Sequence, residues 1–108
     1  MIHDPAVGVH LYRIAQEAVN NAIKHGKASR IDIGLTVNEK RIVLAISDNG
    51  IGLPKKPAKI KGLGLRIMQY RAGVIGGSLV AQRQPNGGMA FVCCVKDYVT
   101  LPGKRNKS

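Results

Sequence analysis

Two segments of the chain carry apolar residues at helical spacing. The first runs from about Val9 to His25, and its apolar positions recur every three or four residues while polar residues occupy the opposite side. These positions are Leu11, Ile14, Ala15, Ala18, Val19 and Ala22. The second runs from about Gly64 to Ile75 and stops at Gly76-Gly77. Both spacings predict amphipathic helices, each with one face turned to a core.

Four further segments alternate apolar and polar residues, which is typical of strands with one buried face. Residues 30–37 and 41–47 flank a short polar connection, and residues 78–83 and 89–96 flank a second one that is rich in glycine. Each arrangement fits an antiparallel hairpin. Helices together with hairpins predict an α/β (α+β) two-layer sandwich.

The first hairpin ends in a polar, glycine-rich stretch, Asp48-Asn49-Gly50-Ile51-Gly52. A carboxylate at a strand end, next to glycines that lack a Cβ, allows a planar ligand to come close to the backbone. The Asp48 carboxylate can accept a hydrogen bond from the exocyclic amine that adenine carries and guanine lacks at the same position. Asn-Gly is also a common turn, and taken alone the stretch is more typical of one.

Polar residues at the end of the first helix form a second candidate group. Glu17 and Asn21 are four residues apart and therefore adjacent on a helix, with Lys24 and His25 on the next turn. A solvated face would show the same pattern. Upstream of the second helix, Gly62-Leu63-Gly64-Leu65 would leave backbone N–H groups free for an anion.

Taken together, the order and spacing of these stretches resemble a known family. Residues 16–25 are similar to the N box, residues 48–52 to the first glycine box and residues 62–65 to the second glycine box of the Bergerat-fold ATPases. That superfamily includes the ATP-binding domains of gyrase, chaperones, mismatch-repair proteins and histidine kinases. Residues 11–18 and 70–77 most resemble sensor kinases that pair with LuxR-type regulators, and the resemblance covers about residues 4–97.

The resemblance implies a MgATP site with a role for each box. Asp48, Gly50 and Gly52 would hold adenine, Asn21 would bind Mg²⁺, and Glu17 would polarise the nucleophile as the catalytic residue. The phosphates would meet Lys24, His25, Gly62, Leu63, Gly64 and Leu65. His25 is equally explained as a helix-end residue that the helix dipole favours.

One adenine-binding position departs from the family pattern. Relatives usually follow the last glycine with a threonine that helps to hold adenine, and this chain has Met89 there. A thioether cannot donate that hydrogen bond, which costs about 1 kcal/mol, so we expect weaker ATP binding. A degenerate, non-catalytic nucleotide-binding or interaction module remains an alternative, and so does a serine-kinase anti-sigma factor of the same fold.

The resemblance also implies partners and a fold. The γ-phosphoryl group would go to a histidine on a separate helical dimerisation domain, and indirectly to a LuxR-type response regulator. None of His3, His10 and His25 has the sequence context of the acceptor. The family places its helices on one face of a mixed, mostly antiparallel sheet, and it begins with further secondary structure that we expect to be missing here.

Composition agrees with this interpretation. The chain has 108 residues, enough for one domain over residues 1–100, and we expect a disordered basic tail over residues 101–108. Its formal net charge of +11 favours a polyanionic ligand. The segment of residues 53–61 contains four lysines, and we expect it to be a mobile loop beside a triphosphate. With 4% aromatic residues and no apolar run of ~20 residues, we expect neither nucleic-acid binding nor membrane contact by this segment, and a cytoplasmic location. Cys93 and Cys94 should point to opposite faces of one strand, unpaired.

Overall fold

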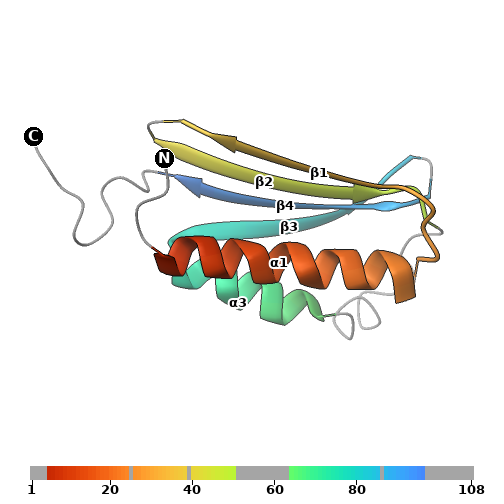
Figure 1. The fold of residues 1–108 in the computed structure, drawn as a ribbon, viewed down its shortest axis with the longest axis horizontal. Coiled ribbons are helices and arrows are strands. Elements are labelled where there is room, and N and C mark those ends of the chain that lie inside the picture. Colours follow the sequence, from red (N-terminus) through yellow and green to blue (C-terminus); the bar gives the residue numbers. More distant parts are fainter. Residues whose placement is uncertain (1–4, 25, 39, 51–63, 86, 97–108) are drawn as a thin grey trace, which may run out of the picture.

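The computed structural model describes residues 5–24, 26–38, 40–50, 64–85 and 87–96. Within these ranges, two helices and four strands follow one another. They are α1 (Pro5–Lys24), β1 (Ile31–Val37), β2 (Arg41–Asp48), α3 (Arg66–Val74), β3 (Gly77–Arg83) and β4 (Met89–Lys96). The strands form one sheet in the order β1-β2-β4-β3, and its three pairings are all antiparallel (Figure 1).

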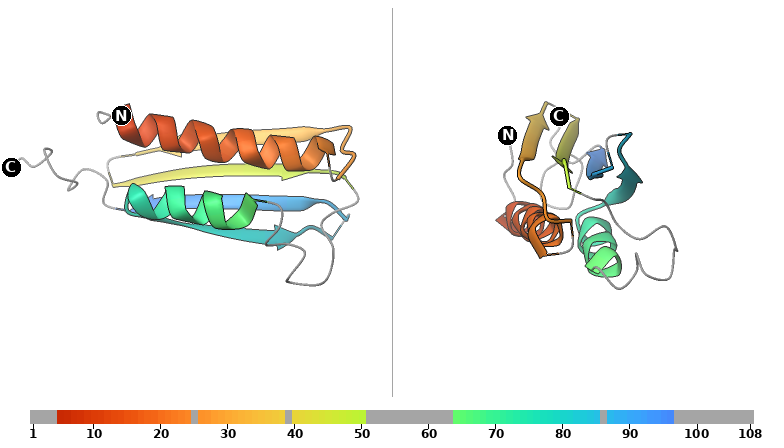
Figure 2. Two further views of the ribbon diagram at one scale, coloured as in Figure 1. Left: turned by 90° about the horizontal axis from the view of Figure 1, so that it is seen from below. Right: turned by 90° about the vertical axis from the view of Figure 1, so that its right-hand side faces the viewer.

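Both helices pack on the same face of the sheet and run in opposite directions (Figure 2). The predicted two-layer α+β sandwich is therefore confirmed, as are the two hairpins. The parallel pairing that a mixed sheet would include does not occur among the strands that the structure describes. No helix in the described ranges is long and apolar enough to cross a membrane.

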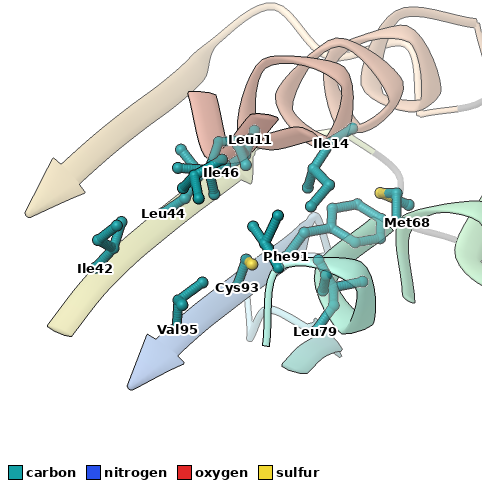
Figure 3. Close-up of a cluster of buried hydrophobic side chains, with 14 of the residues drawn as sticks. Leu11, Ile14, Ile42, Leu44, Ile46, Met68, Leu79, Phe91, Cys93 and Val95 are labelled. Atoms are coloured by element: carbon teal, nitrogen blue, oxygen red, sulfur yellow. The ribbon is translucent and has the colours of Figure 1, made fainter. Parts of the chain in front are cut away.

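The core lies between the helices and the sheet. Along β2 and β4 every second side chain is buried, and these side chains pack against the inner faces of α1 and α3 (Figure 3). The largest completely buried ones are Phe91, Ile14, Ile42, Ile46 and Met68, followed by Val7, Val95 and Cys93. The strands bury every second residue and the helices bury residues spaced about 3.6 apart, and these buried faces form a single cluster.

Two element boundaries differ from the prediction. α1 begins at Pro5 rather than Val9, because proline is tolerated in the first turn of a helix and the added turn buries Val7 at 2% exposure. α3 begins at Arg66 rather than Gly64, since residues 64 and 65 form a wider π turn before it. The cysteine prediction is confirmed: both are free, Cys93 is buried and Cys94 is half-buried.

Candidate functional site

The predicted site residues that the structure describes gather at one end of the sandwich. The C-terminal ends of α1 and β2 and the N-terminal ends of α3 and β4 all lie there (Figure 1). His25, Gly52, Gly62 and Leu63, together with the lysine-rich loop and the basic tail, fall outside the described residues. The topology alone thus brings the first glycine box next to the end of the N box.

Asp48 is the last residue of β2, and it is buried at 8% exposure. Its Oδ1 accepts a hydrogen bond from the Gly50 N–H at 2.8 Å and a longer one from the Met89 N–H at 3.4 Å. Within the described part of the chain, Oδ2 accepts none. The carboxylate is therefore oriented by the backbone through one oxygen, while the other remains available to a donor on a ligand.

Glycines pack tightly around this carboxylate. A Cβ on Gly50 would lie 2.8 Å from the carbonyl carbon of Gly26, which follows α1. A Cβ on Gly88 would lie 2.7 Å from the carbonyl carbon of Asp48 and 2.9 Å from its Oδ1. Either substitution would force backbone segments apart, so the absence of side chains at both positions is what allows three segments to converge on Asp48.

Asn49 ties the end of β2 to the loop between α1 and β1. Its Oδ1 accepts hydrogen bonds from the N–H groups of Ser29 at 3.0 Å and Arg30 at 2.9 Å, and its Nδ2 donates to Ser29 Oγ at 3.0 Å. The sequence prediction placed Asn49 in the first glycine box and in a common turn, but it gave the side chain no role and missed this function. The sole signal was its amide, which can donate and accept, and its partners lie about twenty residues away in the chain.

The polar stripe at the end of α1 is not a uniform solvated face. Asn21 is buried at 4% exposure, Glu17 is half-buried, and Lys24 is exposed on the last turn. The main-chain oxygen of Asn21 accepts a hydrogen bond from the Gly26 N–H at 3.0 Å, which closes the helix end. For Asn21 the solvated-face interpretation is therefore wrong, whereas the exposure of Lys24 is compatible with it.

Glu17 meets the second glycine box. A Cβ on Gly64 would lie 2.8 Å from the Glu17 Cδ, so the carboxylate occupies the space that a side chain at residue 64 would need. Gly64 also has a φ of +82°, which favours glycine. Leu65 follows at the N-cap of α3, partly buried against the core, without a side-chain cap.

Met89 lies beside Asp48, and its side chain packs in the core. Its thioether is part of the core at 3% exposure, and its backbone N–H is directed at Asp48 Oδ1. Met89 therefore contacts the Asp48 carboxylate through its backbone N–H, a group that every residue except proline has. The missing threonine hydroxyl does not alter this contact.

The donor set fits a magnesium ion bound together with phosphates rather than a closed protein cage. No cluster of three or more His, Cys, Asp or Glu side chains exists in the part of the chain that is described. Asn21 carries an uncharged amide oxygen, and Glu17, one helical turn earlier, carries a carboxylate on the same stripe of α1. Mg²⁺ commonly takes few protein ligands and completes its shell with water and substrate phosphate oxygens.

Comparison with known proteins agrees with the site. The sequence profile of the family described as "Histidine kinase-, DNA gyrase B-, and HSP90-like ATPase" matches residues 6–99. The chain belongs to this ATPase family. The predicted resemblance is therefore confirmed at the level of the family, while nothing in the comparisons tests the roles of individual residues.

The relatives include sensor kinases. The chain is 42% identical over 92 residues to the nitrate/nitrite sensor protein NarQ of Escherichia coli, covering 82% of this chain and 16% of that protein. It is 34% identical over 84 residues to NarX of the same organism, covering 78% of this chain and 14% of that one. The sensor histidine kinase LiaS of Bacillus subtilis is 40% identical over 68 residues, covering 63% and 19%. The chain thus spans less than a fifth of the length of these relatives.

Solved structures give the same fold. The ATP-binding domain of PrrB from Mycobacterium tuberculosis is 26% identical, with a TM-score of 0.66 over 82% of this chain and 68% of that one. A histidine kinase domain from Erythrobacter litoralis superposes with a TM-score of 0.72 over 93% of this chain and 50% of that one. Because its identity is 16%, this second likeness concerns the fold alone.

Proposed function

We propose that the chain is the catalytic domain of a sensor histidine kinase, which binds MgATP and donates its γ-phosphoryl group to a histidine on a separate helical domain. The observation that carries the proposal is the Asp48 carboxylate, whose Oδ1 is held by Gly50 N–H and Met89 N–H while no group among the described residues donates to Oδ2. Kinship with sensor kinases supports the same assignment. No observation favours an anti-sigma factor.

Base recognition is assigned to Asp48. Its Oδ2 would accept a hydrogen bond from the adenine amine, while guanine presents a carbonyl at that position and would leave two acceptors facing each other. Gly50 and Gly88 keep side chains away from the base edge. Met89 takes part through its backbone, and Gly52 stays in the proposal on sequence alone.

Phosphate and metal binding are assigned to the ends of the two helices. Lys24 lies on the last turn of α1, and Gly64 and Leu65 precede α3, whose first N–H groups have no acceptor within the helix. His25, Gly62 and Leu63 are retained from the sequence for the same role. Asn21 would hold Mg²⁺, which screens the charge of the phosphate oxygens when bound.

Glu17 is assigned the role of orienting the attacking group. Its half-buried carboxylate lies on the same stripe of α1 as Asn21 and against Gly64, so it would face the phosphates from the helix side. There it would accept a hydrogen bond from the incoming imidazole or water and orient it for in-line attack. Holding the nucleophile at that distance requires a docked partner domain.

The phosphoacceptor is proposed to lie outside this chain. Nδ1 of His10 is 3.3 Å from Nη1 of Arg71, in a partly buried contact between α1 and α3, which is a poor position for an attacking ring nitrogen. The proposed partners are therefore a helical dimerisation domain and, through it, a response regulator of the LuxR type. Because ATP supplies the phosphoryl group, we place the reaction in the cytosol.

Calorimetric titration and labelling together test the proposal. MgATP should bind with a stoichiometry of one, and GTP should give no heat. Incubation with γ-labelled ATP should leave no acid-labile label on the chain alone, and label should appear on a helical phosphoacceptor domain from a related sensor kinase when it is added. Absence of MgATP binding would sink the function altogether, whereas stoichiometric self-labelling would overturn only the separate acceptor.

A further inference from the structure

Arg83 ends strand β3 beside the candidate site, outside the three sequence boxes. Alternate residues of β3 face the helices, since Leu79 is buried in the core and Ala81 packs against it. Arg83 continues this alternation and pairs with the buried Met89 of β4. Because opposite residues of an antiparallel pair point to the same face, the Arg83 side chain leaves the sheet on the helix side. It is solvent-exposed there.

The same row of the sheet contains the proposed base contact. Asp48 lies one step beyond the Ser47–Ala90 pair of β2 and β4, and the Met89 N–H lies 3.4 Å from its Oδ1. Asp48 is also a buried position in the alternation of β2. The row across three adjacent strands is therefore Asp48, Met89 and Arg83, all on the helix side. Neighbouring strands lie about 4.8 Å apart, so the backbones of Asp48 and Arg83 are roughly 10 Å apart, which suits two contacts on one nucleotide.

Arg83 also lies level with the start of α3. The helix leads into β3 through a short connection at Ile75 and Gly76, and the two elements lie side by side and run in opposite directions (Figure 2). A helix rises ~1.5 Å per residue and a strand ~3.4 Å, so Gly64 and Arg83 each lie roughly 15–20 Å from that connection. Arg83 is therefore on the sheet side of the backbone proposed to meet the phosphates.

The charges at this end of α3 favour an anion. Residues 66–69, the first turn of the helix, include Arg66 and no acidic residue, and Leu65 provides no side-chain cap. The positive end of the helix dipole thus coincides with two arginine cations, an arrangement that a bound anion would stabilise. The Glu17 carboxylate lies against Gly64, but it comes from the α1 side. A polyanion would add the negative charge that α3 itself does not supply.

We infer that Arg83 is a further phosphate-binding residue of the nucleotide site, an assignment that rests on the MgATP binding proposed above. With adenine at Asp48 and the phosphates at the start of α3, the Arg83 guanidinium approaches the phosphate chain from β3, while Lys24 approaches from α1. The planar, permanently charged guanidinium can donate two parallel hydrogen bonds to phosphate oxygens. The contact therefore adds affinity for the phosphates and none for the base.

Nucleotide titrations of the chain test this contact. Arg83→Gln should weaken MgATP and MgADP binding by about three- to tenfold, because it removes a charge-assisted contact, and should leave adenosine binding unchanged. Arg83→Lys should retain part of the lost affinity, since it keeps the charge without the paired donors. Tripolyphosphate should displace ATP from the wild-type chain and should bind Arg83→Gln more weakly by the same factor. The wild-type affinity for ATP should also fall more steeply with salt than that of Arg83→Gln.

Arg41→Gln is the matched control. Arg41 begins β2 at the far end of the sheet, is likewise exposed, and its replacement removes the same charge from a chain of net charge +11. Affinities for MgATP and tripolyphosphate should stay those of the wild type. Equal losses in the two variants would show a general effect of charge, and an equal loss of adenosine binding in Arg83→Gln would place the guanidinium on the base or ribose. Either result would overturn the phosphate contact.

Two further outcomes separate this contact from the nucleotide site as a whole. If the wild-type chain binds MgATP and Arg83→Gln binds it with the same affinity, Arg83 does not contact the phosphates, while the proposed function stands. If the wild-type chain binds neither MgATP nor adenosine, the nucleotide site itself is refuted, and the role of Arg83 with it.

Discussion

The Glu17 carboxylate of α1 lies in the space that a side chain at Gly64 would occupy. The group proposed to orient the nucleophile is therefore in contact with the backbone that precedes α3. Because Gly64 also has a φ of +82°, this junction can be altered by adding one methyl group.

Gly64→Ala should destabilise the domain and reduce catalysis. The left-handed backbone costs a non-glycine residue about 1–2 kcal/mol, and the new Cβ would displace the Glu17 carboxylate. We expect a lower melting temperature and a phosphoryl-transfer rate that falls more than ATP affinity does. Gly73→Ala is the control, because a Cβ there meets nothing within 4 Å and alanine in a helix should stabilise by about 0.5 kcal/mol. Equal effects of both variants would show that the contact with Glu17 is incidental.

Asp48→Asn separates base recognition from folding. Gly50 N–H and Met89 N–H both require an acceptor, so the asparagine oxygen should replace Oδ1 and its NH₂ group should replace Oδ2. Two donors would then face each other when adenine binds, and we expect ATP affinity to fall ~10- to 150-fold with little change in the melting temperature of the free domain. Asp48→Ala should lower both the ATP affinity and the melting temperature, since it also leaves the Gly50 and Met89 N–H groups without their acceptor. Unchanged ATP affinity in the asparagine variant would remove Asp48 from the adenine site.

The fold could be predicted from the sequence because its signals are local. The strand alternation around Phe91 and the helical spacing around Ile14 each define a buried face within a few residues, and the glycine boxes carry a family pattern. Asn49 could not be assigned its function, since its hydrogen bonds reach Ser29 and Arg30 through the folded structure. The side chain of Met89 was considered only in place of a threonine, whereas strand periodicity places it in the core.

The two cysteines should differ in reactivity with pH. Burial, and secondarily the neighbouring Cys94, raises the pKa of the Cys93 thiol to about 11. In the folded domain at pH 8 a thiol reagent should therefore modify Cys94 first and Cys93 only after unfolding. Because the folded state holds the Cys93 proton more tightly than the unfolded state, this group's contribution to stability should be complete below about pH 9 and be lost toward pH 11. Fast modification of both thiols in the native state would contradict the burial of Cys93.

Asn21→Ala should remove the metal-dependent part of ATP binding. The Gly26 N–H that closes the end of α1 donates to the main-chain oxygen of Asn21, so this hydrogen bond survives the substitution. We expect MgATP affinity to approach that of ATP measured with a chelator, while metal-free ADP binds as before. If every ligand weakens equally, Asn21 supports the site structurally and does not bind the ion.

Asn49→Ala should reveal how far the nucleotide site depends on the link between β2 and the loop after α1. The substitution leaves the N–H groups of Ser29 and Arg30 without their acceptor, which should cost about 1 kcal/mol of stability. It should also weaken MgATP binding several-fold, because the loop that starts at Gly26 packs directly against Gly50, beside Asp48.

A matched asparagine elsewhere distinguishes this effect from general destabilisation. Asn38 Oδ1 likewise accepts hydrogen bonds from two N–H groups, those of Lys40 at 3.0 Å and Arg41 at 2.9 Å, in the turn between β1 and β2 at the far end of the sheet (Figure 1). Asn38→Ala should therefore lower the melting temperature by a similar amount and leave nucleotide affinity unchanged. If calorimetry shows the same loss of MgATP affinity in both variants, Asn49 stabilises the fold without positioning the site.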